Sequence, residues 1–263
     1  MFDSKLIDIL EQAQRIVVFT GAGASAESGI PTFRDALTGL WENFDPAQLA
    51  TPEAYYANPD LVWAWYEWRR QLVRRCQPNA GHYAMAALQD HAEQVTVVTQ
   101  NVDDLHERAG SRDVVHLHGS LHHPYCSDCA RLHSFSGAES DGAPLAAEPQ
   151  AGMPPPACVA CGGMVRPGVV WFGESLPTAE WQRAHEEIAE CDVLFSVGTS
   201  SVVYPAADLP RQAREAGATV IQVNPSETGL ESWVHYNLAG PAGELLPALI
   251  DTAFGTGAGQ SPA

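Results

Sequence analysis

The sequence has no long hydrophobic run and few basic residues. Its longest apolar runs, such as Ile16–Phe19, are far shorter than the ~20 residues that span a bilayer. The N-terminal segment mixes charges into its apolar positions, unlike a secretory signal, so we expect a cytoplasmic protein. Lysine and arginine total 14 against 32 acidic residues, a formal net charge of −18. That charge would repel nucleic-acid phosphates, so we expect neither a nucleic-acid nor a membrane partner.

Cysteine is also scarce, with six residues in the chain of 263. Disulfides are not expected in a cytoplasmic protein, and two of the six lie singly in apolar segments. The other four form the pairs Cys126/Cys129 and Cys158/Cys161, each with the Cys-x-x-Cys spacing of a zinc ribbon. A Cys₄ zinc site is closed and structural. Redox chemistry is the alternative, but two pairs that bracket one insertion argue against it.

Strand-like and helix-like segments alternate along most of the chain. Four β-branched runs each end in a small or polar turn: Arg15–Ser25, Val95–Asp103, Val193–Ser201 and Thr219–Glu227. Helical segments between them are predicted at Ala80–Asp90, Thr178–Glu190 and Pro205–Ala216. This alternation predicts an α/β fold with a Rossmann-like, doubly wound parallel sheet, whose ligands bind at the carboxyl ends of the strands.

Two segments interrupt this alternation. Residues 36–79 hold several tryptophans and predict a small helical insertion, and residues 122–165 hold the cysteine pairs. We therefore predict a Rossmann-like domain over 1–121 and 166–254, a zinc-ribbon insertion over 122–165, and a disordered tail over 255–263.

A glycine-rich turn follows the first predicted strand. The stretch Gly21-Ala22-Gly23-Ala24-Ser25-Ala26 fits the G-x-G-x-x-G/A dinucleotide pattern, in which glycines let the backbone approach a pyrophosphate. A structural tight turn is the alternative for this motif alone. No second strand ending in an acidic residue follows, so we predict nucleotide binding without routine hydride transfer.

Two histidines follow the apolar pair Val114–Val115. His116 and His118 are two residues apart, so on a strand their side chains would share one face. Gly119 leaves the surroundings of the His118 ring open. Imidazole accepts a proton near neutral pH, which makes His118 a candidate general base, although a lone histidine is more often structural.

Taken together, these motifs resemble those of sirtuins, the NAD-dependent protein-lysine deacylases. "GAGASAESGIPTFR", "TQNVDDLHERAG", "LHG", the two cysteine pairs, "VVWFGE", "VGTSS" and "VNP" occur in the sirtuin order, over about residues 10–250. The resemblance implies a Rossmann-like NAD domain with a small inserted zinc domain, and an active site in the cleft between them. It implies NAD as co-substrate, one structural zinc ion per chain, and acyl-lysine proteins or peptides as partners.

The resemblance also implies roles for individual residues. His118 matches the catalytic base, which would activate the ribose hydroxyls of NAD so that the acyl group leaves as O-acyl-ADP-ribose. The segments Val169–Glu174 and Val202–Tyr204 would hold the substrate backbone as a strand. The residues implied in NAD binding are Gly21, Ala22, Gly23, Ala24, Ser25, Ile30, Pro31, Phe33, Arg34, Trp41, Gln100, Asn101, Val102, Asp103, Gly198, Thr199, Ser200, Asn224, Pro225, Ser226 and Ala242.

The stretch "LVWAWYEWRR" at 61–70 combines large aromatic residues with paired arginines. As a helix it places Leu61, Trp65, Trp68 and Leu72 on one apolar stripe, which we interpret as core. Tyr66 and Arg69 lie three apart on a neighbouring stripe. A sirtuin subgroup that removes succinyl, malonyl or glutaryl groups carries this Tyr-x-x-Arg pair in its acyl pocket. An exposed basic helix edge is the alternative.

Two other functions remain open from the sequence. One is ADP-ribosyl transfer to a protein side chain, which has less need of a base acting on the ribose. The other is an NAD-binding sensor without turnover, which would not require the set formed by Gln100, Asn101, Asp103 and His118.

Overall fold

The computed structural model describes residues 2–31, 49–135 and 152–255. The predicted sites at Phe33, Arg34 and Trp41, and most of the predicted tail, therefore lie outside the described residues. Among the described helices, none combines the length and apolar composition needed to cross a bilayer.

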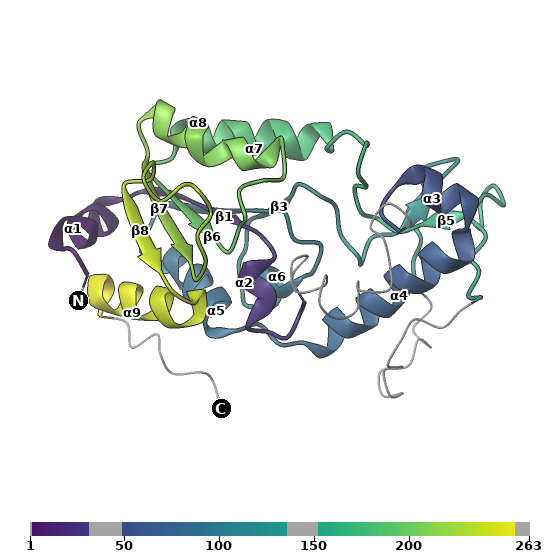
Figure 1. Cartoon of the computed structure of the whole chain (residues 1–263), viewed down its shortest axis with the longest axis horizontal. Coiled ribbons are helices and arrows are strands. Elements are labelled where there is room, and N and C mark those ends of the chain that lie inside the picture. Colours follow the sequence, from purple (N-terminus) through teal and green to yellow (C-terminus); the bar gives the residue numbers. More distant parts are fainter. Residues whose placement is uncertain (1, 32–48, 136–151, 256–263) are drawn as a thin grey trace.

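A parallel six-stranded sheet forms the centre of the fold (Figure 1). Its strand order is β3-β2-β1-β6-β7-β8, so the direction of winding reverses between β1 and β6. The strands are β1 Arg15–Thr20, β2 Gln94–Thr99, β3 Val114–His116, β6 Val193–Val197, β7 Thr219–Asn224 and β8 Tyr236–Ala239. The predicted Rossmann-like, doubly wound sheet is confirmed, and its switch point lies between β1 and β6.

Helices cover both faces of the sheet (Figure 1). On one face, Ile16 and Val18 of β1 pack into a cluster with α1 (Ser4–Gln12), α5 (Ala80–Ala87) and α9 (Ala242–Phe254). On the other, Val17 and Phe19 pack against α7 (Thr178–Glu190) and α8 (Leu209–Ala216). Because alternate residues of β1 are buried on opposite faces, the strand reads as one continuous apolar run.

The tryptophan-rich segment forms helices at one end of the molecule (Figure 1). Helix α3 spans Pro52–Ala57 and α4 spans Pro59–Arg75. The Asn58 side chain caps α4 by accepting a hydrogen bond from the Leu61 N–H, and Pro59 occupies the first turn. Arg74 and Arg75 lie in the last turn, where cations complement the helix dipole.

A small two-stranded antiparallel sheet contains Cys126 and lies beside the other three cysteines of the two pairs. It consists of β4 (Tyr125–Cys126) and β5 (Val165–Arg166). The Tyr55 hydroxyl of α3 donates a hydrogen bond to the Val165 carbonyl at 2.9 Å, which ties the helical insertion to this sheet. Among the described residues, the remaining short elements are α2 (Gly23–Ala26), α6 (Leu105–Arg108), and 3-10 turns at Leu88–Asp90 and Ala206–Asp208.

Candidate active site

The glycine-rich turn packs against a second glycine turn across the switch point. Gly21 N–H donates to the Val197 carbonyl and Gly23 N–H to the Gly198 carbonyl, at 3.1 and 2.8 Å. A Cβ on Gly23 would lie 2.6 Å from the Gly198 oxygen, and one on Gly198 only 2.2 Å from the Ala24 nitrogen. These glycines are needed for the close approach of two backbone segments, a reason that the dinucleotide pattern did not reveal.

A hydrogen-bond network joins this turn to the loop after β2. The Ser25 hydroxyl donates to Asp103 Oδ2 at 3.0 Å, and Asn101 Nδ2 donates to the Ser25 hydroxyl at 3.1 Å. Asp103 Oδ1 accepts from the Leu105 N–H. Burial raises the pKa of the Asp103 carboxyl, and these two hydrogen bonds offset part of that effect. The network fixes Asn101 and Asp103 at one wall of a cavity.

The strand ends on the other side of the switch point are linked to the same loop. Gln100 Nε2 donates to Thr199 Oγ1 at 3.0 Å, and Asn224 Nδ2 donates to the Thr199 carbonyl at 2.9 Å. Asn224 Oδ1 also accepts from the Ser226 N–H. Donors and acceptors from several strand ends thus converge where a doubly wound sheet binds nucleotides, and this set fits a dinucleotide such as NAD.

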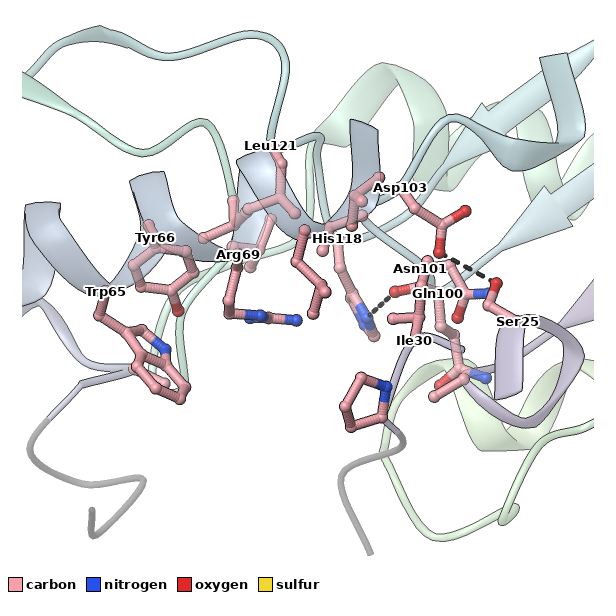
Figure 2. Close-up of a pocket in the computed structure, with 18 of the residues that line it drawn as sticks. Ser25, Ile30, Trp65, Tyr66, Arg69, Gln100, Asn101, Asp103, His118 and Leu121 are labelled. Carbon is pink, nitrogen blue, oxygen red and sulfur yellow. Dashed lines mark hydrogen bonds between the residues drawn. The ribbon is translucent and has the colours of Figure 1, made fainter. Parts of the chain in front are cut away.

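A cavity of about 220 Å³ connects this edge of the sheet with α4. Figure 2 shows Trp65, Tyr66 and Arg69 at one end and Ser25, Asn101 and Asp103 at the other, with His118 between them. Of the predicted site residues, those that line it are Ala22, Ser25, Ile30, Pro31, Tyr66, Arg69, Gln100, Asn101, Val102, Asp103 and His118. The predicted positions that do not line it are Gly21, Gly23, Ala24, Gly198, Thr199, Ser200, Asn224, Pro225, Ser226 and Ala242.

His118 lies in the turn just after β3, not within a strand as the spacing suggested. Its Nδ1 is 3.0 Å from the Gln100 carbonyl oxygen (Figure 2). Because a carbonyl oxygen only accepts, Nδ1 carries the proton and Nε2 has the free lone pair. Burial lowers the pKa of His118, and the bond to Gln100 opposes this only in part. The ring is therefore neutral near pH 7 and can accept a proton.

Tyr66 and Arg69 both line the cavity. The Arg69 guanidinium lies 5.6 Å from the centre of the Tyr66 ring. Burial lowers the pKa of the Arg69 guanidinium, while Tyr66 and Asp103 raise it. Within residues 2–31, 49–135 and 152–255, Arg69 forms no ion pair with a carboxylate. Arg70 differs, since it is buried and pairs with Glu67 on another side of α4.

The apolar stripe of α4 is more than core. Trp65, Trp68 and Leu72 also line the cavity, although we interpreted them as core alone. Trp171 was missed as a partner of the pocket: its indole Nε1 donates to the Tyr66 hydroxyl at 3.0 Å. No sequence spacing could have found this contact, because 105 residues separate the two side chains.

The four predicted metal ligands come together. The sulfur atoms of Cys126, Cys129, Cys158 and Cys161 all lie within 4.8 Å of one another. Cys126 Sγ is 3.5 Å from Cys161 Sγ, and Cys129 Sγ is 3.7 Å from Cys158 Sγ. Zinc–sulfur bonds of ~2.3 Å in a tetrahedron place sulfurs ~3.8 Å apart. The cluster therefore fits one structural zinc ion with no open ligand position.

Comparison with known protein families agrees with this geometry. A model of the Sir2 family matches residues 21–205, more than half of the chain. The chain belongs to the Sir2 family. This sirtuin is 54% identical over 251 residues to the NAD-dependent protein deacylase of Methylococcus capsulatus, covering 95% of this chain and 96% of that protein. It is 56% identical to NAD-dependent protein deacylase 1 of Pseudomonas aeruginosa, covering 95% and 98%.

Solved structures of other Sir2 proteins share the fold of this sirtuin. A Sir2 homologue in complex with NAD superposes with a TM-score of 0.86 at 43% identity, covering 96% of this chain and 94% of that one. A Sir2 complex with a p53 peptide and NAD⁺ superposes with a TM-score of 0.80 at 28% identity, covering 96% and 98%.

Proposed function

We propose that this sirtuin is an NAD-dependent protein-lysine deacylase that prefers acyl groups bearing a negative charge, such as succinyl and malonyl. Two features support deacylation: membership of the Sir2 family, and the cavity that joins His118 to the strand ends. NAD, when bound, supplies an electrophilic ribose carbon and nicotinamide as its leaving group. The acyl-lysine side chain would enter from the α4 end of the cavity.

The chain's own residues would orient the reactants and move a proton. His118 presents its Nε2 lone pair as the proton acceptor, with the ring held by Gln100. Asn101 and Asp103 would face the nicotinamide ribose, where the Ser25 network keeps them in place. Groups held in position gain much of their catalytic effect from orientation, worth up to ~7–11 kcal/mol.

The charge preference depends on one observation: a part-buried arginine lines the cavity without an ion pair to any described carboxylate. Burying a cation without a counter-charge is costly, and an acyl carboxylate would supply that charge. Arginine can bind a carboxylate with two parallel hydrogen bonds, and the Tyr66 hydroxyl can donate a third. The Tyr66 oxygen already accepts from Trp171, so its own proton is left for the ligand.

The test compares matched peptides carrying acetyl-lysine and succinyl-lysine. We expect Arg69→Met to lower kcat/KM for the succinyl peptide by roughly 100-fold, the effect of losing hydrogen bonds to a charged group, and to change acetyl turnover little. Arg74→Met is the matched control, because Arg74 is exposed on the same helix and does not line the cavity. Equal losses on both substrates would exclude the charge preference.

Product analysis in the same assay separates deacylation from the two other functions. A deacylase releases nicotinamide only with an acyl-lysine peptide and forms O-acyl-ADP-ribose. Labelled ADP-ribose on the peptide itself would indicate a transferase, and binding of NAD without nicotinamide release would indicate a sensor.

A further inference from the structure

His116, which the function above leaves unused, has a hydrogen-bond acceptor at each ring nitrogen. Its Nδ1 lies 3.1 Å from the Asn101 carbonyl oxygen. Its Nε2 lies 2.7 Å from Glu107 Oε1 on α6. The His116 side chain is largely buried, at 18% exposure, whereas the Glu107 side chain is 42% exposed.

This arrangement requires two N–H donors on one ring. A carbonyl oxygen and a carboxylate both only accept, and a neutral imidazole has a single N–H. A neutral ring would leave a nitrogen lone pair facing an acceptor oxygen. The Glu107 carboxyl is ionised, because His116 lowers its pKa against the opposing effect of burial. Both contacts are therefore satisfied only by the imidazolium.

The charges around His116 favour the same form. From α6, the Glu107 carboxylate faces the His116 ring directly. The buried His106 on the same helix lies near enough for repulsion from His116 to lower the pKa of His106. From the loop after β2, the Asp103 carboxylate also stabilises the cation. Burial lowers the pKa of His116, but its bonds to Glu107 and Asn101 outweigh burial, and the net shift is upward.

The carbonyl that His116 holds belongs to the loop on which the pocket depends. The Asn101 N–H donates to Thr99 Oγ1 at 3.0 Å, and the Asn101 side chain donates to Ser25. With His116 on its carbonyl, Asn101 is fixed from three directions. His118 holds the preceding carbonyl, of Gln100, in the same way. The two histidines thus anchor consecutive peptide groups of one loop.

We propose that His116 is a positioning residue: as an imidazolium paired with Glu107, it holds the Asn101 carbonyl and so orders the loop 100–103 for NAD. This rests on the proposed function, because the loop is assigned there to the NAD ribose. His116 and His118 then act in opposite protonation states, two residues apart. Activity needs His118 neutral and His116 charged, so their two titrations bound the active pH range.

The direction of the alkaline limit follows from the upward shift of His116. Its contribution is complete well below its raised pKa and is lost as pH rises through that value. Above it the ring keeps a single N–H, which stays with the Glu107 carboxylate as the stronger acceptor, and the Asn101 carbonyl loses its donor. We expect the KM for NAD to rise roughly tenfold there, the effect of one lost hydrogen bond to a charged group.

The first test needs neither NAD nor substrate. Nitrogen-15 NMR of the free protein follows each histidine ring with pH, and the His116 signals are those missing from His116→Gln. We expect both His116 nitrogens to be protonated at about pH 7, with a midpoint above the ordinary ~6.5. A midpoint at or below ~6.5 would overturn the proposal. Because no turnover is measured, this result is independent of the proposed deacylase activity.

The second test is the pH dependence of NAD binding in Glu107→Gln. Without the carboxylate, the midpoint of the His116 titration should fall. The alkaline rise in KM for NAD should therefore move roughly one pH unit lower. The acidic limb of kcat, governed by His118, should stay where it is. In His116→Gln, which cannot titrate, the alkaline rise should disappear. Glu180→Gln, an exposed acid on α7, is the charge-matched control and should behave as the parent protein. An unmoved alkaline limb in Glu107→Gln would refute the positioning role.

Discussion

The indole Nε1 of Trp171 donates a hydrogen bond to the Tyr66 hydroxyl across 3.0 Å, joining the segment after β5 to helix α4. Trp171 is itself held in place. Its backbone N–H donates to Glu174 Oε2, and the Arg166 guanidinium lies 3.7 Å from the centre of the Trp171 ring. Arg166 also forms a two-bond ion pair with Glu174. The α4 end of the cavity is therefore positioned from the side of the cysteine cluster.

This contact predicts a selective effect of Trp171→Phe. Phenylalanine keeps an aromatic ring but removes the N–H donor, so the Tyr66 hydroxyl loses its fixed orientation. Loss of one net hydrogen bond, ~1 kcal/mol, predicts roughly a fivefold fall in kcat/KM for a succinyl-lysine peptide. Acetyl-lysine turnover should change little. A double variant with Tyr66→Phe should be no worse than Tyr66→Phe alone, and additive losses would argue against the coupling.

The pH–rate profile at saturating NAD predicts an acidic limb governed by His118. Burial lowers the pKa of His118, so its neutral form, the proton acceptor, persists to lower pH than an exposed histidine. We expect kcat to fall only below the ordinary value of 6.5. His118→Asn should lose nearly all deacylation even at saturating NAD. A midpoint above 6.5 would contradict this assignment.

Zinc removal should destabilise the fold rather than remove a catalytic group. Elemental analysis should give about one zinc per chain, since the cysteine geometry fits a single closed Cys₄ site. Cys126→Ser should lose the metal and unfold the β4–β5 module, which contacts α3 through Tyr55 and Val165. Cys76→Ser, outside the cluster, is the control and should retain zinc. A folded, metal-free Cys126→Ser protein with full activity would exclude a structural zinc.

The packed glycine turns predict that two similar substitutions lower the free energy of unfolding by different amounts. Gly198 and Gly217 both have positive φ, at 60° and 107°. A Cβ on Gly198 would lie 2.2 Å from the Ala24 nitrogen, whereas a Cβ on Gly217 would meet nothing within 4 Å. Gly217→Ala should cost ~1 kcal/mol of unfolding free energy, from backbone strain alone. Gly198→Ala should cost more and raise the KM for NAD. Equal unfolding free energies in urea, with unchanged KM, would show that the turns do not need to pack this closely.

The sequence predicted a long, uninterrupted helix well, and missed a short edge strand and a helix that contains a proline. Helix α7 has the predicted bounds, Thr178–Glu190, because its helical pattern is long and uninterrupted. The edge strand β8 was not predicted, because it is only four residues long and alternates exposed and part-buried residues, and β3 covers only three residues of the segment that was considered as a strand. Helix α9 was also missed, and it includes Pro247, a residue that usually ends a helix.

Local spacing determined much of the site as well. Residues three apart on a helix meet, and paired Cys-x-x-Cys motifs form ligand sets, so the proximity of Arg69 to Tyr66 and the clustering of the four cysteines were predictable. Which partner each side chain has was decided only by the tertiary structure. His116 ends β3 and His118 lies just after it, and only the fold shows that His118 has one acceptor whereas His116 has two. The protonation state of a ring depends on groups that folding brings to it from distant segments, and no local pattern records those.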